Sequence, residues 1–305
     1  MFITVFPGQG SQTPGFLAPW LELDGARERL EQFSSDAGVD LVAAGTEWDA
    51  DRIRDTQVAQ PLIVAASLLS YAALTDAAHT TPGGVAGHSV GEVAALVAAG
   101  VLTPADGMRL VGIRGRAMAQ AAAAEQTGMS AVIGGDRDAV LARLAELGLT
   151  PANHNGGGQI VAAGALASLA ALAESPVAGT RVIPLQVAGA FHTRYMAPAV
   201  ETLRAAAADV AASDPRVTLW TNHDGTTVDT GDAAVELLVN QVASPVRWDL
   251  CMESFADHDV TGIIELSPAG TLVGLAQRSL RGLPSVAVKT PDDLAAAAAP
   301  LTGQG

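Results

Sequence analysis

Apolar positions along the chain fall into two kinds of segment: short continuous runs, and longer stretches with a helical period. Such an alternation is typical of α/β proteins. Residues 1–6 form the first continuous run and predict a buried parallel strand. Residues 57–78 carry apolar side chains at three- and four-residue spacings and predict a helix. The same patterns predict strands at 84–87, 217–221 and 262–266, and helices at 25–35, 90–99, 104–124, 195–212 and 232–242.

The pattern changes in the middle of the chain, where shorter elements follow one another closely. Strands are expected there at 129–133, 159–163 and 181–187, with helices at 136–147 and 165–174. This β-α-β-α-β run predicts a small inserted ferredoxin-like α+β subdomain at 125–189. Residues 1–124 and 190–305 are then expected to form a large α/β subdomain, an α/β-hydrolase-like core with a mostly parallel sheet. The last residues, 295–305, are expected to fray.

Composition and charge exclude several classes of function. The formal net charge of −15 over 305 residues argues against nucleic acid, which is bound by neutralising phosphates with Lys and Arg, and against an anionic membrane surface. A single cysteine, Cys251, excludes an internal disulfide and a cysteine-rich zinc site, and no metal is expected. We see no signal-like leader, and no membrane-length apolar run free of Gly or charge. A cytoplasmic protein is therefore expected.

A G-x-S-x-G pattern at residues 87–91 is the first candidate for chemistry. It lies between a predicted strand and a predicted helix, which is the context of a nucleophile elbow. The glycines allow a tight turn that larger side chains would block, and the serine is presented at a helix N-terminus. The pattern is short enough to occur by chance, and it is the strand–turn–helix context that favours Ser89 as a nucleophile.

A serine nucleophile needs a base, and six histidines are available. His192 lies where the inserted subdomain returns to the large one, and clefts at such junctions are common positions for sites. His88 is adjacent to Ser89, but neighbours on a sharp turn point apart, so we expect His88 to line the pocket instead. Surface or structural roles are expected for the other four histidines.

Arg114 is placed unusually for a charged residue. On the predicted 104–124 helix it lies in the middle of the apolar stripe, whereas Arg109 and Arg116 fall away from that stripe and are expected to face solvent. A buried guanidinium must find an anion. The anion is either an internal carboxylate or a free carboxylate of the substrate, which a guanidinium can hold through two hydrogen bonds.

The stretch Gly8-Gln9-Gly10 follows the first strand and invites a dinucleotide-binding interpretation. That interpretation requires glycine at position 13, where this chain has Thr13, and an acidic residue after a second strand, which we do not find. A loop whose bare backbone approaches an oxyanion fits the glycines better.

Four separated segments give a more specific indication: FPGQGSQ at 6–12, GHSVGE at 87–92, GAFH at 189–192 and QVASPVRW at 241–248. In these segments, in their order and in their spread over nearly the whole chain, the sequence resembles the malonyl-CoA:acyl-carrier-protein transacylase family. That family includes free-standing acyltransferases of fatty-acid and polyketide synthesis.

The resemblance implies a role for each of several catalytic residues. Ser89 would be the nucleophile and His192 its base. Gln9 and Val90 would give backbone N–H groups to an oxyanion hole. The main-chain carbonyl of Gln241 would orient the histidine, in place of the acid of a catalytic triad.

The resemblance also implies a substrate pocket. Arg114 lies where the family holds the malonyl carboxylate, and Phe191 belongs to a motif similar to that of malonyl-selective members. Gly189 stands where multidomain synthases commonly have a larger residue, which leaves slightly more room. Asn153 and Asn155 resemble an Asn-x-Asn segment that lines the cleft, and an ordinary polar turn is an equal alternative for them.

The implied reaction moves a malonyl or related carboxyacyl group from coenzyme A to the phosphopantetheine thiol of an acyl carrier protein, through acyl-Ser89. The expected partners are acyl-CoA and the acyl carrier protein, with no bound cofactor, nucleic acid or membrane, and with a monomeric protein. Three alternatives stay open. One is a transferase of the same fold for a different extender or a preassembled chain. The others are a hydrolase of acyl-carrier thioesters and a catalytically idle module that docks the carrier.

Overall fold

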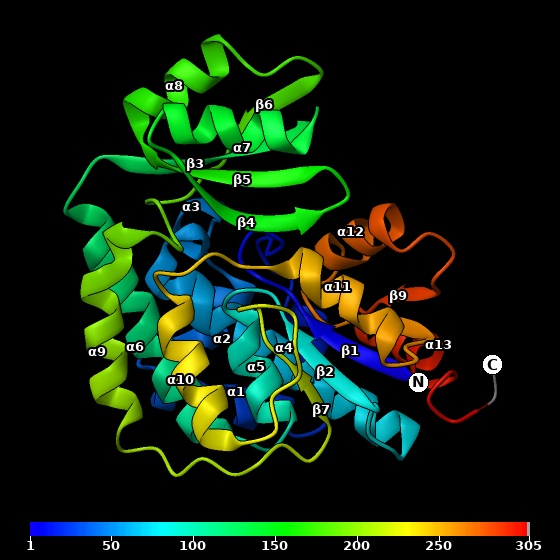
Figure 1. The fold of residues 1–305 in the computed structure, drawn as a ribbon. Coiled ribbons are helices and arrows are strands. Elements are labelled where there is room, and N and C mark those ends of the chain that lie inside the picture. Colours follow the sequence, from blue (N-terminus) through cyan, green and yellow to red (C-terminus); the bar gives the residue numbers. More distant parts are fainter. Residues whose placement is uncertain (304–305) are drawn as a thin grey trace.

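Two sheets of different type organise the protein, whose computed structural model describes residues 1–303 (Figure 1). The larger sheet has only parallel pairings, and its strand order is β7 (Thr218–Trp220), β2 (Gly84–Gly87), β1 (Phe2–Phe6), β8 (Gly262–Glu265) and β9 (Ser285–Ala287). The smaller sheet is antiparallel, in the order β4 (Thr150–Gly156), β5 (Gln159–Ala165), β3 (Thr127–Gly134) and β6 (Thr180–Pro184). The expected α/β class is confirmed.

The register of the large sheet brings two predicted motifs together. The last residue of β1, Phe6, pairs with the last residue of β2, Gly87. Parallel strands end at the same edge of a sheet, and ligand sites of open α/β sheets form at that edge. The loop that follows β1 and the turn that follows β2 therefore lie side by side at the carboxyl edge.

Helices cover both faces of the large sheet. They are α1 (Ala26–Ala37), α2 (Leu41–Thr46), α3 (Ala50–Arg54), α4 (Thr56–Ala78), α5 (Gly91–Ala98), α6 (Pro104–Ala123), α9 (Ala197–Ala207), α10 (Gly231–Gln241), α11 (Trp248–Asp257), α12 (Thr271–Ser279) and α13 (Leu294–Ala298). Short 3-10 helices occur at Ala18–Glu22, Arg194–Met196 and Pro291–Asp293. The helix expected at 195–212 is shorter than predicted, because a 3-10 turn precedes α9 and the helix stops at Ala207.

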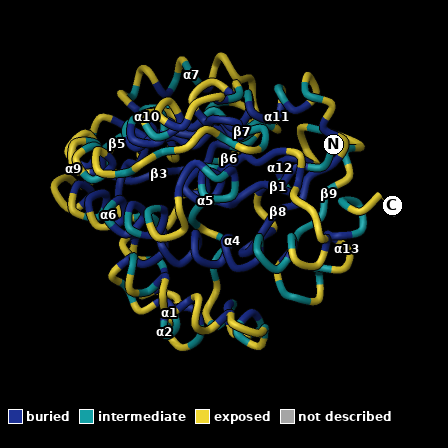
Figure 2. The backbone as a smooth tube through the Cα atoms, turned by 90° about the horizontal axis from the view of Figure 1, so that it is seen from below, coloured by how far each residue is buried: buried dark blue, intermediate teal, exposed yellow. Residues whose placement is uncertain are grey.

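Helix α4 forms the centre of the large core and packs against α5, α6 and α13. Figure 2 shows it in the buried interior, while the outer turns of α1 and α9 are exposed. Among the described residues, it is the one helix that is long and apolar enough, by length and composition, to cross a membrane. The expectation that no such run exists is wrong, because residues 56–75 contain neither Gly nor a charge. The side chains of α4 are mostly buried inside the protein.

The small subdomain has the element order β3, α7 (Arg137–Glu146), β4, β5, α8 (Leu166–Glu174) and β6. Two antiparallel β-α-β units with the strand order 4-5-3-6 make a ferredoxin-like arrangement. Strand β4 was not predicted from the sequence. Pro151, Asn153, Asn155 and Gly156 all have low strand propensity, and they are held by pairing with β5.

Residues 125–189 as a separate folding unit remain a proposal. A hydrophobic cluster confined to this part of the chain supports it, and the cluster consists of Val132, Val140, Leu144, Leu149, Ile160, Ala162, Leu169 and Leu172. Strand β4 links the unit to the large subdomain, since the backbone N–H of His154 donates to Val246 O over 2.9 Å and the N–H of Val246 donates to Ala152 O over 2.8 Å.

The carboxyl-terminal part of the chain is more regular than the sequence suggested. Helices α11, α12 and α13 and strand β9 were not predicted. Where fraying was expected from residue 295, the chain forms α13, in which Ala297 and Ala298 are buried. The last two residues of that expectation, 304–305, lie outside the described residues. A capping box between Thr290 and Asp293 starts the turn that leads into it.

Candidate active site

The turn between β2 and α5 has the geometry of a nucleophile elbow. Ser89 has a φ of 53°, in the left-handed region that L residues rarely adopt. A Cβ added at Gly87 would overlap the backbone of Gly91 and Glu92, and one added at Gly91 would overlap Phe6 O. The two glycines are required because β1, the turn and α5 pack backbone against backbone.

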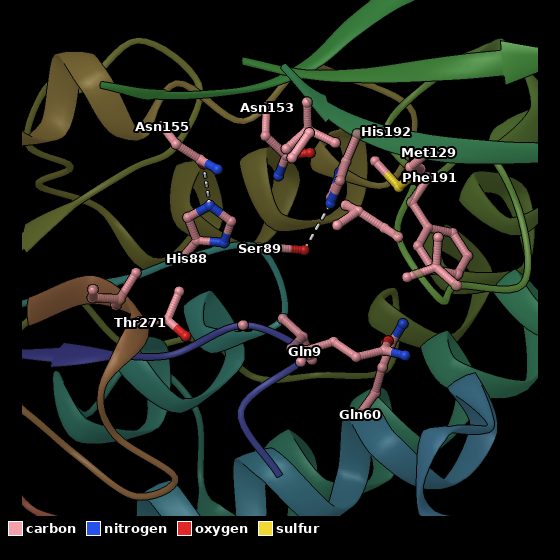
Figure 3. Close-up of a pocket in the computed structure, with 18 of the residues that line it drawn as sticks. Gln9, Gln60, His88, Ser89, Met129, Asn153, Asn155, Phe191, His192 and Thr271 are labelled. Carbon is pink, nitrogen blue, oxygen red and sulfur yellow. Dashed lines mark hydrogen bonds between the residues drawn. The ribbon is translucent and has the colours of Figure 1, made fainter. Parts of the chain in front are cut away.

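Ser89 and His192 lie together although 103 positions separate them in the chain. The Ser89 Oγ is 2.7 Å from His192 Nε2 (Figure 3). On the other side of the ring, His192 Nδ1 is 2.8 Å from the main-chain oxygen of Gln241. Because a carbonyl oxygen only accepts, Nδ1 carries the proton and Nε2 is free to receive one from Ser89. Within residues 1–303 no carboxylate bonds to this imidazole, so a main-chain carbonyl occupies the position of the triad acid.

Burial keeps His192 neutral. Desolvation, followed by the nearby positive charge of Arg114, lowers its pKa to about 3. Only 3% of the residue is exposed, and its φ of 60° is also left-handed. Both members of the pair thus sit in strained backbone, which is common where a site is held in a fixed geometry.

A cavity of about 310 Å³ separates the two subdomains and opens onto this pair. All the predicted site residues line it except Gln241, which lies behind His192. Its apolar wall comes mainly from the small subdomain and α6: Met118, Met129, Ala131, Val161, Leu185 and Val187. Helix α12 adds a further wall through Thr271, Leu272 and Leu275.

Arg114 lies at the floor of this cavity with 1% of its surface exposed. Its Nη1 donates to Gln60 Oε1 over 2.6 Å and its Nη2 to Gln241 Oε1 over 2.9 Å, while its buried Nε has no partner. It forms no direct ion pair with any described residue, and the buried carboxylate of Glu92 acts on it as a counter-charge from the far side of the Gln241 side chain. Desolvation lowers its pKa to about 10, which leaves it charged at neutral pH. Arg116 faces outward and Arg109 is partly exposed.

His88, Asn153 and Asn155 form the opposite wall. The two asparagines lie on strand β4, so the alternative of an ordinary polar turn is wrong. Asn155 Nδ2 donates to Gln159 Oε1 over 2.9 Å, which leaves its Oδ1 to accept from His88 Nε2 over 2.9 Å. Burial lowers the pKa of His88. His88 therefore presents a fixed neutral ring to the cavity and points away from the Ser89 hydroxyl (Figure 3).

Gln9 and Val90 both line the cavity. Val90 is the residue before α5, where unpaired N–H groups point out of a helix. The Gln9 side chain is turned toward α3, since its Nε2 donates to Arg54 O over 3.2 Å.

Sequence reasoning missed three polar residues of the site. Gln60 is a polar residue within an apolar helix, and that pattern could have drawn attention to it. Asn222 follows β7 at the carboxyl edge of the sheet, and its Oδ1 accepts the Ser89 N–H over 2.8 Å. Glu92 belongs to the GHSVGE segment but received no role. Within residues 1–303 no three His, Cys, Asp or Glu side chains gather as metal ligands would.

Comparison with known proteins gives consistent results. Residues 3–296 match the family described as acyl transferase domain. A malonyl CoA-acyl carrier protein transacylase of Mycobacterium bovis is 52% identical over 96% of this chain and 98% of its own length. The protein of that name from Escherichia coli K12 is 34% identical, over 97% of this chain and 98% of its own length.

Solved structures agree with the sequence comparisons. The crystal structure of MCAT from Mycobacterium tuberculosis superimposes with a TM-score of 0.94 at 52% identity, covering 98% of this chain and 99% of that one. A malonyl-CoA:acyl carrier protein transacylase from Xanthomonas oryzae gives a TM-score of 0.91 at 37% identity, and the superposition covers 97% of this chain and 96% of that one. The similarity therefore extends over both subdomains.

Proposed function

Because the chain belongs to the acyl transferase family, we propose that it transfers a malonyl group from coenzyme A to the phosphopantetheine thiol of an acyl carrier protein. The relatives reported above are named for this reaction, and they match the chain over nearly its whole length. The acyl group travels as an ester of Ser89. The reaction needs no bound cofactor, since the donor thioester already carries an activated acyl group.

One observation carries the proposal: a serine–histidine pair lines the same cavity as a buried guanidinium that has no direct ion-pair partner among the described residues. The Ser89–His192 pair supplies a nucleophile for a thioester carbonyl. Arg114 supplies a cation with an unused donor, and a carboxylate is the anion that a guanidinium fork fits best. A malonyl thioester has the carbonyl and the carboxylate in one small group.

In the first half-reaction, Ser89 becomes acylated. The Ser89 Oγ attacks the thioester carbonyl while His192 Nε2 accepts the hydroxyl proton. The resulting oxyanion accepts hydrogen bonds from the backbone N–H groups of Gln9 and Val90. When it collapses, the carbon–sulfur bond breaks and coenzyme A leaves as a thiol, with the proton from His192. The carbonyl of Gln241 stabilises the imidazolium form between these steps.

The second half-reaction reverses these steps with another thiol. The phosphopantetheine thiol of the carrier gives its proton to His192 and attacks the ester, and Ser89 leaves as a hydroxyl. Throughout, Arg114 holds the free carboxylate, which fixes the acyl group relative to the nucleophile. The cytoplasmic location and the monomeric state stay predictions.

Mapping the covalent intermediate tests this function. The protein is incubated with malonyl-CoA, denatured and digested, and the peptides are analysed by mass spectrometry. We expect a malonyl ester on the Ser89 peptide of the wild type and none in Ser89→Ala. An unmodified Ser89 peptide in active wild-type protein would rule out the mechanism. A panel of acyl-CoA donors then separates malonyl from branched or neutral acyl groups.

A further inference from the structure

A buried carboxylate, Glu92, lies directly behind the active site. It is the second residue of α5 and three positions after Ser89, and 2% of its surface is exposed. One of its oxygens accepts the backbone N–H of Asn222, and the other accepts the side-chain amide of Gln241. Burying a carboxylate costs desolvation free energy unless its oxygens accept hydrogen bonds. A buried carboxylate beside the active site with both oxygens hydrogen-bonded therefore indicates a specific structural role.

Gln241 connects this carboxylate to two parts of the site. Its Nε2 donates to Glu92, its Oε1 accepts from Arg114 Nη2 over 2.9 Å, and its main-chain oxygen is 2.8 Å from His192 Nδ1. An ionised carboxylate only accepts hydrogen bonds and a guanidinium only donates them. The amide between them can therefore adopt one orientation only, and Glu92 sets it.

Asn222 connects the other oxygen of Glu92 to the nucleophile. The Asn222 side chain accepts the Ser89 N–H over 2.8 Å and donates to Gly87 O. Both of these bonds are made to the backbone of the elbow. The carboxylate thus holds one residue that fixes the turn carrying Ser89, and another that fixes Arg114 and His192.

We propose that Glu92 is a positioning residue that keeps Arg114 aligned with the Ser89–His192 pair. Its ionised carboxylate fixes the Gln241 amide, so the guanidinium stays directed at the acyl carboxylate of the substrate. This inference rests on the proposed function, because it assigns Glu92 to malonyl recognition at the same site.

Electrostatics supports this assignment. Burial raises the pKa of Glu92 to about 7, and the positive charge of Arg114 is among the factors that oppose the rise. Arg114 on α6 is the charged group that acts on the pKa of Glu92 from a neighbouring element, and Glu92 in turn helps to raise the pKa of the Cys251 thiol on α11. The Cys251 pKa is raised well above 9, so this thiol stays neutral. Because the pKa of His192 is about 3, His192 does not titrate near neutral pH.

Protonation of Glu92 therefore has a defined consequence. A protonated carboxyl has lost its charge and carries a donor on one oxygen, so it holds the Asn222 N–H and the Gln241 amide less firmly than the carboxylate does. Arg114 then loses its alignment, and malonyl-CoA is used less efficiently as pH falls through about 7. Acetyl-CoA lacks the carboxylate but has the same phosphates. The ratio of kcat/KM for malonyl-CoA to that for acetyl-CoA isolates the effect, because ionisation of the coenzyme cancels.

Glu92→Gln keeps the shape of the side chain and removes its charge. The oxygen of the new amide must accept the hydrogen bond from the backbone N–H of Asn222, so the NH₂ group of the new amide faces Gln241. The Gln241 amide then flips, and its NH₂ opposes Arg114 Nη2. We expect a roughly 10- to 100-fold fall in kcat/KM for malonyl-CoA, the effect of losing a charge-assisted hydrogen bond, and a smaller fall for acetyl-CoA.

Glu265→Gln is the matched control. Glu265 is also a fully buried carboxylate with a raised pKa, and it accepts the backbone N–H groups of Gly270, Leu272 and Val273 at the start of α12. It touches neither Gln241 nor Asn222. Whatever this variant does to stability, we expect it to retain the wild-type pH dependence of the malonyl-to-acetyl ratio.

The experiment measures this ratio for the wild type and both variants from about pH 5.5 to about pH 8.5. We expect it to fall below pH 7 in the wild type and in Glu265→Gln, and to be low and independent of pH in Glu92→Gln. A pH-independent ratio in the wild type would overturn the proposal without any variant. A ratio that keeps its wild-type value and pH dependence in Glu92→Gln would also overturn it. If the wild type forms no malonyl-Ser89, the proposed function itself fails.

Discussion

Arg114→Ala removes the only group we assign to recognition of the acyl carboxylate. The guanidinium is held by Gln60 and Gln241, and its orientation is set before any substrate binds. Two charge-assisted hydrogen bonds to a bound carboxylate contribute about 3–5 kcal/mol at typical values for such bonds. Their loss corresponds to a fall of roughly 10²- to 10⁴-fold in kcat/KM for malonyl-CoA.

Acetyl-CoA distinguishes recognition from a general defect. It makes no bond to Arg114, so we expect Arg114→Ala to acylate Ser89 from acetyl-CoA as well as the wild type does, or better. Stopped-flow or quenched-flow acylation with each donor measures both rates. Arg116→Ala is the matched control: it removes an arginine from the exposed side of the same helix, where the side chain donates to Ala37 O. Equal losses with malonyl-CoA and acetyl-CoA would show that Arg114 acts structurally and would refute the assignment.

Three further predictions concern pH, packing and thiol chemistry. Burial and the charge of Arg114 lower the pKa of His192 to about 3. The His192 imidazole therefore stays neutral in the folded protein, whereas in the unfolded chain it takes up a proton below about pH 6.5. The wild type should therefore lose stability relative to His192→Gln as pH falls, by roughly 2 kcal/mol at about pH 5 in urea titrations, and a pH-independent difference would contradict this. Gly87→Ala places a Cβ against the backbone of Gly91 and should lower the free energy of unfolding by about 3 kcal/mol or more; a fully stable, active variant would show that the turn is not as crowded as described. Cys251 is buried and its pKa is raised well above 9, so alkylating reagents should modify it only in denaturant, and rapid labelling of the native protein would disprove its burial.

The elements predicted correctly are those whose apolar pattern is strong over a local stretch. Strands β1, β2 and β8 are short apolar runs, and α4 and α6 are long periodic helices. Whether these elements are buried can therefore be predicted from their own residues. Strand β4 was missed because its side chains are polar and it is ordered by its neighbours on both sides. Helix α13 was missed because an alanine-rich end resembles a solvated tail until the residues that cover it are known.

The same distinction applies to the site. Ser89 was found from a local turn motif, and Arg114 from a charge on an apolar stripe, both of which are short-range signals. His192 was a candidate from its position at the junction of the two subdomains, whereas its assignment as the base and the role of Gln241 came from resemblance to a family. Glu92 and Asn222 were missed because their function consists of contacts between distant parts of the chain. In sequence, 149 positions separate Glu92 from Gln241 and 130 positions separate Glu92 from Asn222. No spacing rule within one element could reveal such contacts.

The central claim is that Ser89 carries an acyl group from one thiol to another, and a two-step single-turnover measurement tests it most directly. Wild-type protein is acylated with malonyl-CoA, freed of coenzyme A, and mixed with a phosphopantetheinylated acyl carrier protein while intact masses are followed. We expect the malonyl ester on Ser89 to disappear as malonyl-carrier appears, faster than free malonate is released. Release of malonate at a rate unchanged by the carrier, with no malonyl-carrier formed, would contradict it and identify a hydrolase.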